Sequence, residues 1–177
     1  LEFRRVLFRS INLSFWDYND VAPGYFAAAE IAAREKKIGI IAIEVARPDL
    51  PVADRSTFAD KDPRAAAKGL YVIRDFAPGP RHGYVVCQGA FATYNTVKML
   101  PKLAAAGVNV KVISAVSEEL FDHQPESYRE SVLPKGAKQD LMFVMGSTRR
   151  VWPLRNVGRS EEHTSELQSR QYLVCRL

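Results

Sequence analysis

Two short segments at the ends of the chain decide how much of it can form a native fold. One choice of codons for residues 1–10 reads, on the complementary DNA strand, as codons for residues 159–168. A protein has no physical reason to carry such an inverted nucleotide repeat, whereas the flanking adapter of a sequencing library has one by construction. We therefore expect residues 1–10 and 159–177 to be adapter-derived and the native sequence to occupy residues 11–158.

The charge balance changes once these ends are set aside. They hold six basic and four acidic residues, so the formal charge of the rest falls from +5 to +3. That ordinary balance, with no basic stripe, argues against a nucleic-acid partner. No apolar run reaches the roughly 18 residues that a membrane span needs, which argues against a membrane partner. The single remaining cysteine, Cys87, cannot form an internal disulfide, as is typical of the reducing cytoplasm.

Strand-like and helix-like segments alternate along residues 11–158. Residues 38–45 are mostly apolar and rich in β-branched side chains, the pattern of a strand buried on both faces of a parallel sheet. The expected strands are 13–16, 38–45, 70–74, 84–87, 108–114 and 141–145, and the expected helices are 25–37, 93–106, 118–122 and 125–132. This alternation predicts an α/β fold of layered βαβ units with a mostly parallel sheet.

Turn-forming residues predict where the chain divides and where its helices end. Residues 77–80 (Ala-Pro-Gly-Pro) break the chain, and we place a domain junction there, between residues 75 and 76. Pro101 is expected to kink or split the helix around it, and Gly107 to cap that helix at its end. Ser117 is expected to cap the short helix that follows it.

Arg47 is the strongest candidate for a binding residue. It follows the expected strand 38–45, at the sheet edge where open α/β folds place their ligands. A planar guanidinium can donate two parallel, charge-assisted hydrogen bonds to phosphate oxygens, although a surface ion pair is the structural alternative. Asp49, Asp54 and Arg55 lie in the same loop and are expected to shape it through turns and ion pairs.

The other candidates have simpler structural explanations. His82 and His123 could titrate near neutrality but are expected to be surface or capping residues. Cys87 lies in an apolar strand and is expected to be a core residue. Gly89 begins a strand-to-helix turn that could bind phosphate, yet it lacks the dinucleotide pattern and the Walker lysine, so we favour a plain turn. A basic, aromatic cluster could contact an anion or a subunit or be a solvated tail: Arg149, Arg150, Trp152 and Arg155. No pair of His, Cys or carboxylate residues shows metal-ligand spacing.

Three stretches stand in a fixed order along the chain. The first is Ala-Arg-Pro-Asp-Leu-Pro at residues 46–51, and the second is Lys-Gly-Leu-Tyr-Val-Ile-Arg-Asp at residues 68–75. The third runs from Val-Ile-Ser at 112–114 through Phe-Asp-His-Gln-Pro at 121–125 to Tyr-Arg-Glu-Ser-Val-Leu-Pro at 128–134. In order and spacing they resemble the "SRQNLP", "KGGYVLRD" and "VVS…FDKQP..YR.SVLP" motifs of the transketolase family.

This resemblance implies a function and a division of the chain. Residues 11–75 would be the C-terminal part of a thiamine pyrimidine-binding domain, and residues 76–158 a truncated transketolase C-terminal-like α/β domain. The parent enzyme would transfer a two-carbon ketol unit between sugar phosphates, with thiamine diphosphate and Mg²⁺ as cofactors, as a cytoplasmic homodimer. Arg47 matches the family's arginine that binds the substrate phosphate. Catalytic, cofactor and metal ligands are expected outside this chain, so the fragment itself is expected to be inactive.

Departures from the family pattern leave alternatives open. Residues 18–23 read Tyr-Asn-Asp-Val-Ala-Pro where the family has "PADANET", and residues 88–93 replace its "TGSEV" turn. Another thiamine-diphosphate enzyme, such as the first component of pyruvate dehydrogenase, is one alternative, and a non-catalytic binding or regulatory module with the same fold is a second. An unrelated doubly wound nucleotide-binding protein is a third, and it would bind its ligand at Gly89 rather than at Arg47.

Overall fold

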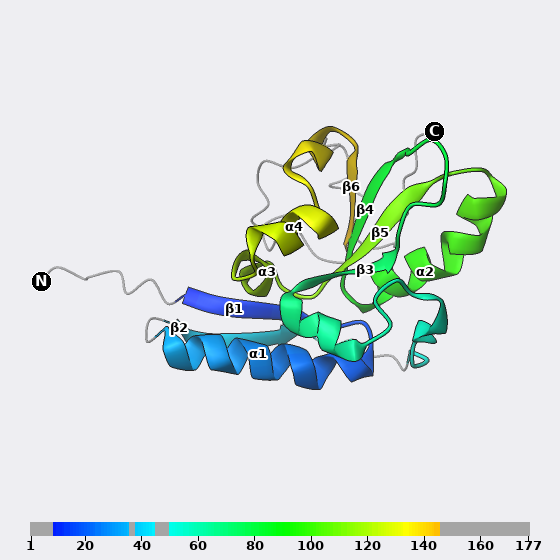
Figure 1. Ribbon diagram of the computed structural model, residues 1–177. Coiled ribbons are helices and arrows are strands. Elements are labelled where there is room, and N and C mark those ends of the chain that lie inside the picture. Colours follow the sequence, from blue (N-terminus) through cyan, green and yellow to red (C-terminus); the bar gives the residue numbers. More distant parts are fainter. Residues whose placement is uncertain (1–8, 36–37, 45–49, 146–177) are drawn as a thin grey trace, which may run out of the picture.

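Two sheets in contact form the part of the chain that the computed structural model describes, residues 9–35, 38–44 and 50–145 (Figure 1). The smaller sheet pairs β1 (Arg9–Ser14) with β2 (Ile38–Glu44) in parallel. The larger sheet has the order β3-β5-β4-β6, formed by β3 (Leu70–Arg74), β4 (Gly83–Gln88), β5 (Val110–Ala115) and β6 (Leu141–Met145). Among these described strands only the β3–β5 pair is antiparallel, which confirms the predicted α/β fold with a mostly parallel sheet.

Helices connect the parallel strands, as the alternation of segments predicted. α1 (Val21–Arg34) links β1 to β2, and α2 (Ala90–Ala105) links β4 to β5. β5 is linked to β6 by α3 (Glu118–Asp122), α4 (Glu126–Val132) and the 3-10 helix η4 (Lys135–Gln139). The other 3-10 helices are η1 (Tyr18–Asp20), η2 (Arg55–Thr57) and η3 (Pro63–Lys68). α2 covers one face of the larger sheet, and α3 and α4 cover the other (Figure 1).

α1 begins four residues earlier than expected because a capped 3-10 turn, η1, leads directly into it. The Asp17 carboxylate accepts a hydrogen bond from the Asn19 N–H at 3.1 Å and begins η1, which continues directly into α1. Pro23 lies in the first turn of α1, where a missing N–H leaves no hydrogen bond unmade. No helix within the described ranges is long and apolar enough to cross a membrane.

β2 forms where predicted, but its side chains are not buried on both faces in this chain. Ile40 is 49% exposed and Ile43 is 43% exposed. β2 pairs with β1 along one edge, and none of the described residues pairs with its other edge. A β-branched run favours a strand whatever its neighbours are, whereas burial on two faces requires layers packed against both of them.

β3 belongs to the larger sheet, although we placed the domain junction after it. It pairs antiparallel with β5, from Leu70 opposite Ala115 to Arg74 opposite Val112. The strand before the expected junction is therefore hydrogen-bonded to the strands that follow it. The division between residues 75 and 76 stays a prediction.

The expected turn and cap residues account for several helix ends. Pro101 lies inside α2, exposed to solvent, and does not split the helix. Gly107 adopts a left-handed conformation (φ 71°) just after α2, and its N–H donates to the Ala104 carbonyl at 3.0 Å, which confirms the predicted cap. The Ser117 hydroxyl accepts a hydrogen bond from the Leu120 N–H at 3.3 Å and caps α3, also as predicted.

The two sheets share one core and meet closely beside Gly69. The N–H of Ser14 donates to the Val116 carbonyl at 2.8 Å, and the N–H of Val116 donates to the Gly69 carbonyl at 2.7 Å. Gly69 has φ 86°, and a Cβ there would lie 2.3 Å from the Ser117 carbonyl oxygen and 2.4 Å from the Phe121 nitrogen. Both atoms belong to the backbone and cannot rotate away, so this contact requires a glycine.

Replacing Gly69 should therefore lower the free energy of unfolding more than replacing a glycine whose only unusual feature is a positive φ angle. Gly107→Ala leaves φ at 71° and meets nothing within 4 Å, so we expect it to lower the free energy of unfolding by about 1 kcal/mol. Gly69→Ala adds two backbone clashes, and we expect a loss of at least about 3 kcal/mol. Urea unfolding of both variants measures the difference. Equal losses would show that the close contact between Gly69 and α3 is absent.

Candidate functional site

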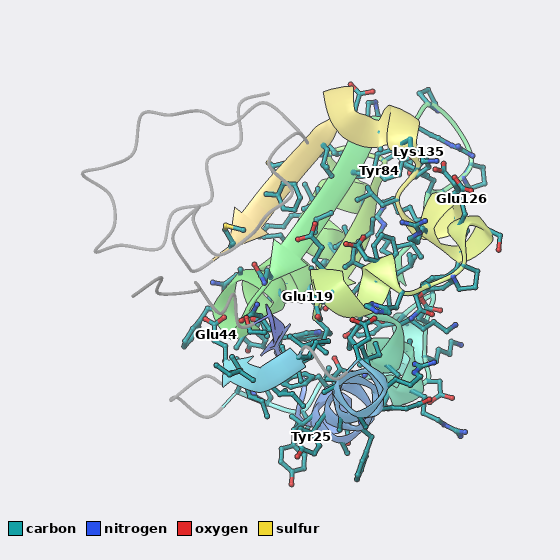
Figure 2. The ribbon with its side chains drawn as sticks, turned by 90° about the vertical axis from the view of Figure 1, so that its left-hand side faces the viewer. Tyr25, Glu44, Tyr84, Glu119, Glu126 and Lys135 are labelled. Carbon is teal, nitrogen blue, oxygen red and sulfur yellow. The ribbon has the colours of Figure 1, made fainter. Side chains whose placement is uncertain are left out.

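The carboxyl ends of β1 and β2 form the edge at which the candidate ligand-binding loop begins. β1 ends at Ser14 and β2 at Glu44, and the Phe15 N–H donates to the Glu44 carbonyl at 3.3 Å. Figure 2 shows Glu44 at this end of β2. Arg47 follows three residues later and, like Asp49, lies outside the described residues. The predicted phosphate contact of Arg47 therefore stays a prediction.

The loop returns to the molecule at η2, and Asp54 shapes that return. Its carboxylate accepts a hydrogen bond from the Ser56 N–H at 3.0 Å, which begins the 3-10 turn. The same backbone contact holds the pKa of Asp54 below its ordinary value. This confirms the expectation that Asp54 acts through a turn.

Arg55 places a positive charge between two buried carboxylates. Its Nη1 atom lies 2.5 Å from Asp20 Oδ1 and 3.1 Å from Asp17 Oδ2. The Arg55 side chain is only 8% exposed, and both aspartate side chains are fully buried. The ion pair expected for Arg55 is thus confirmed, in a buried setting where each charge depends on its partners.

Aromatic side chains complete the network around the guanidinium. The Tyr71 hydroxyl donates to Asp20 Oδ2 at 2.8 Å and accepts from the Trp16 Nε1–H at 2.7 Å. The Arg55 guanidinium lies 4.9 Å from the centre of the Tyr71 ring and 5.8 Å from that of Phe58. Burial raises the pKa of Asp20 to about 6, although its contacts with Arg55 oppose that shift. Burial also raises the pKa of Tyr71 above its ordinary value.

This network is suited to holding the loop rather than to reacting with a substrate. The segment 15–20 binds the start of the loop through Phe15 and its end through Asp17 and Asp20. The charged groups are buried, so a substrate cannot reach them. The Nε and Nη2 atoms of Arg55 have no hydrogen-bond partner within the described ranges.

Sequence reasoning identified Arg55 but missed the residues that hold it. Asp17 and Asp20 precede a helix, where acidic residues are usually solvated caps. Tyr71 lies in an apolar strand, where it is expected to be a core aromatic. The sequence did carry one signal of this ion pair. Two carboxylates stand beside an otherwise apolar segment that includes Trp16, and acids that become buried require a cation.

Gly89 forms the plain strand-to-helix turn that we favoured. It has φ 83° and directly precedes α2, without a side-chain cap. A Cβ at Gly89 would lie 3.7 Å from the Ser14 hydroxyl oxygen, so the end of β1 faces this turn. The smaller sheet thus covers the edge at which a doubly wound nucleotide-binding protein would hold its ligand.

Cys87 and His82 are structural, as expected. Cys87 is fully buried in the core, and burial raises the pKa of its thiol to about 12. The His82 ring accepts a hydrogen bond at Nδ1 from the Asn109 N–H at 2.8 Å, and the His82 N–H donates to the Asn109 carbonyl at 2.8 Å. The Asn109 side chain also donates to the carbonyl of Pro80 at 2.9 Å, which fixes the expected break at residues 77–80.

His123 links the end of α3 to Glu35, the residue that follows α1. Its Nδ1 lies 2.7 Å from the Glu119 carbonyl oxygen, and its Nε2 lies 2.7 Å from the Glu35 carboxylate. Both neighbours are acceptors, so both ring nitrogens must donate, and these contacts raise the pKa of His123. No cluster of three His, Cys, Asp or Glu side chains in the described part of the chain could hold a metal ion. The cluster of Arg149, Arg150, Trp152 and Arg155 lies outside that part.

A family comparison decides what kind of protein this is. The family model described as the transketolase-like TK C-terminal domain matches residues 69–165, more than half of the chain. The chain belongs to the transketolase family. The resemblance inferred from the three sequence motifs is thus confirmed.

Curated transketolases are similar to this chain over about three quarters of its length. Transketolase 2 of Escherichia coli is 32% identical over 138 residues, which are 76% of this chain and 19% of the relative. Transketolase of Geobacillus stearothermophilus is 32% identical over 132 residues, which are 75% of this chain and 19% of the relative. The chain therefore spans only about a fifth of the length of the transketolases that it matches.

Solved transketolase structures share the fold of this chain. Transketolase from Leishmania mexicana superimposes with a TM-score of 0.60 at 20% identity, over 81% of this chain and 19% of the other. Transketolase from Campylobacter jejuni gives 0.57 at 17% identity, over 80% of this chain and 20% of the other. These similarities concern the fold alone.

Removal of the Arg55 charge should strongly destabilise this chain. Arg55→Met strands two buried carboxylates, and we expect the free energy of unfolding to fall by about 3–5 kcal/mol. Arg64→Met is the matched control, because its ion pair with Asp62 is 87% and 58% exposed. Its loss should stay below about 1 kcal/mol. Thermal unfolding near neutral pH measures both losses. Equal losses in the two variants would contradict a stabilising role for the buried Arg55 network.

The His123 contact should make stability depend on pH. The folded-state pKa of His123 is raised, so its contribution is fully present below the ordinary histidine value of about 6.5 and is lost as pH rises through the raised pKa. The stability difference between the wild type and His123→Gln should shrink over that range. Glu35→Gln should remove most of this pH dependence. A difference that stays constant with pH would show that folding does not change the pKa of His123.

Proposed function

We propose that this chain is part of an enzyme that transfers a two-carbon ketol unit from a ketose phosphate to an aldose phosphate. The match of the transketolase C-terminal family model to residues 69–165 supports this proposal most strongly. Two curated transketolases support it independently, at 32% identity over most of the chain. The enzyme would use thiamine diphosphate and Mg²⁺, and it would act as a cytoplasmic homodimer.

Arg47 is the residue that we propose to bind the substrate phosphate. It follows β2, whose carboxyl end lies beside that of β1, at the edge where open α/β sheets bind ligands. The loop that contains it is held at its start by the Phe15 contact with Glu44 and at its end by the buried Arg55. Anchoring at both ends lowers the entropy that an arginine loses when it binds a phosphate.

The cofactors would be held by other parts of the enzyme. The family resemblance implies that the ligands of Mg²⁺ and of thiamine diphosphate lie outside this chain. Thiamine diphosphate supplies the carbanion chemistry, and the protein binds and orients it. The role proposed for this chain is therefore to bind the substrate phosphate and to support the loop that carries Arg47, and the chain by itself should be inactive.

An assay of the full-length parent enzyme tests this role. Arg47→Ala should raise the KM for a ketose phosphate by about 10–100-fold, because a charge-assisted hydrogen bond contributes about 1.5–3 kcal/mol. The KM for the same ketose without its phosphate should change little. Arg64→Ala, at an exposed ion pair, is the control and should change neither value.

Each alternative outcome has a distinct meaning. Equal losses on both donors would show that Arg47 does not read the phosphate. A full-length protein that releases carbon dioxide from pyruvate instead of transferring a ketol unit would place it with the pyruvate dehydrogenases. A protein that binds no thiamine diphosphate would be a non-catalytic module.

A further inference from the structure

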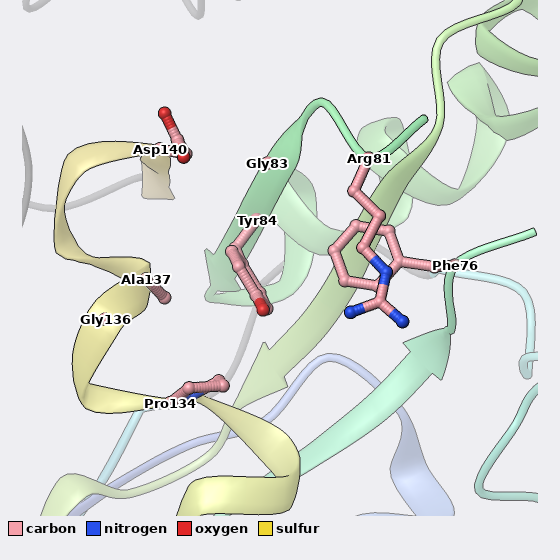
Figure 3. A pocket seen from close by; sticks show the side chains of 8 residues that line it. All are labelled: Phe76, Arg81, Gly83, Tyr84, Pro134, Gly136, Ala137 and Asp140. Atoms are coloured by element: carbon pink, nitrogen blue, oxygen red, sulfur yellow. The ribbon is translucent and has the colours of Figure 1, made fainter. Parts of the chain in front are cut away.

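A pocket of about 330 Å³ lies at the amino ends of β4 and β6 in the larger sheet. Figure 3 shows the Tyr84 ring in its centre, with Phe76 and Arg81 on one side and the turn that carries η4 on the other. Its lining residues are Phe76, Arg81, Gly83, Tyr84, Pro134, Gly136, Ala137 and Asp140. The groups on these two sides point to a ligand independently of the proposed ketol transfer.

One side of the pocket is aromatic and positively charged. The rings of Phe76 and Tyr84 meet edge to face, with their centres 5.2 Å apart and their planes at 82°. The Arg81 guanidinium lies over the Phe76 ring, 4.9 Å from its centre (Figure 3). This stacking holds the guanidinium in place while its N–H donors stay available, since stacking uses the face of the ion. It also occupies a face of Phe76 on which a cationic ligand could lie.

Two polar groups on this side have no partner in the part of the chain that the structure describes. Neither the Arg81 guanidinium nor the Tyr84 hydroxyl has a hydrogen bond or ion pair there. Lys111 lies directly opposite Tyr84 on the neighbouring strand, and its Nζ donates to the Ser131 carbonyl at 2.6 Å. Lys111 therefore adds a fixed positive charge beside the pocket, partly balanced by Asp75 at 3.7 Å.

The other side of the pocket is made of small residues. Pro134, Gly136 and Ala137 lie opposite the Tyr84 ring (Figure 3). A Cβ added at Gly136 would meet nothing within 4 Å, so the space in front of that backbone is open. The Tyr84 ring on one side and these small residues on the other leave room for a flat ligand. Asp140 contributes the only negative charge among the lining residues.

We propose that this pocket binds a small, planar aromatic anion. The ring of the ligand lies between Tyr84 and the Gly136–Ala137 backbone, and its carboxylate or phosphate group accepts hydrogen bonds from the Arg81 guanidinium and the Tyr84 hydroxyl. The aromatic contact and the charged contact each contribute to the affinity. The Tyr84 ring supplies a π-face, and the Arg81 guanidinium and the Tyr84 hydroxyl supply hydrogen-bond donors. Asp140 weakens the binding of any anion through repulsion.

Titration of the complete 177-residue chain with four probes tests the proposal. Benzoate and phenyl phosphate carry both the ring and the charge, benzyl alcohol carries the ring alone, and inorganic phosphate carries the charge alone. Tyr84 fluorescence is not unique in this chain, so binding is followed by two-dimensional NMR of the backbone amides around the pocket. The two aromatic anions should bind at least about tenfold more tightly than either single-feature probe.

Three variants place the binding in this pocket. Gly136→Leu adds a bulky side chain to the lining without backbone strain, and it should weaken both aromatic anions at least about tenfold while the thermal midpoint changes little. Arg81→Gln should weaken the anions by about tenfold and leave benzyl alcohol unchanged. Asp140→Asn should tighten anion binding by a few-fold. Arg64→Gln, an exposed arginine elsewhere, is the control and should change nothing.

Other results would overturn the proposal. Binding of the aromatic anions that is unaffected by both Gly136→Leu and Arg81→Gln would place the ligand elsewhere. Inorganic phosphate that binds as tightly as phenyl phosphate would make this a simple anion site. Weaker binding in Asp140→Asn would show that the pocket prefers a cationic or zwitterionic ligand.

Discussion

A buried guanidinium between two buried carboxylates ties the separate parts of this molecule together. Asp17 and Asp20 come from the segment between β1 and α1, Arg55 comes from the loop after β2, and Tyr71 comes from β3 of the larger sheet. None of these charged groups is stable in the core alone, because each loses its hydration on burial. The two sheets and the loop can therefore reach their observed arrangement only together, which makes their contact specific as well as apolar.

This arrangement decides which edges of the larger sheet are available for ligands. Ser14 faces the Gly89 turn at the carboxyl ends of β4 and β5, and its N–H is bound to the Val116 carbonyl. The site that an open doubly wound sheet would use is thus covered by the smaller sheet. The amino ends of β4 and β6 instead carry an open pocket lined by Arg81 and Tyr84. The proposed transfer reaction depends on the family and on Arg47, whereas the proposed anion site depends on the geometry of the larger sheet.

Much of the fold could be predicted from local sequence. β3 and β6 form at the residues expected, and Gly107 and Ser117 cap the helices as their chemistry requires. The start of α1 was missed because Asp17 begins a 3-10 turn that leads into it. The site was predicted less well. Asp54 and Arg55 were identified as loop-shaping residues, but a carboxylate near a helix start gives no sign of which distant cation it will meet.

The sequence by itself determined the order of strands and helices, the caps, and the transketolase family, because these depend on short-range pattern and on motifs in a fixed order. Tertiary structure alone decided that β3 pairs with the larger sheet. It also decided that Asp17, Asp20 and Tyr71 surround one arginine. Burial and pairing depend on which segments meet in space. Residues up to 55 positions apart form this network, and no local pattern encodes contacts over that separation.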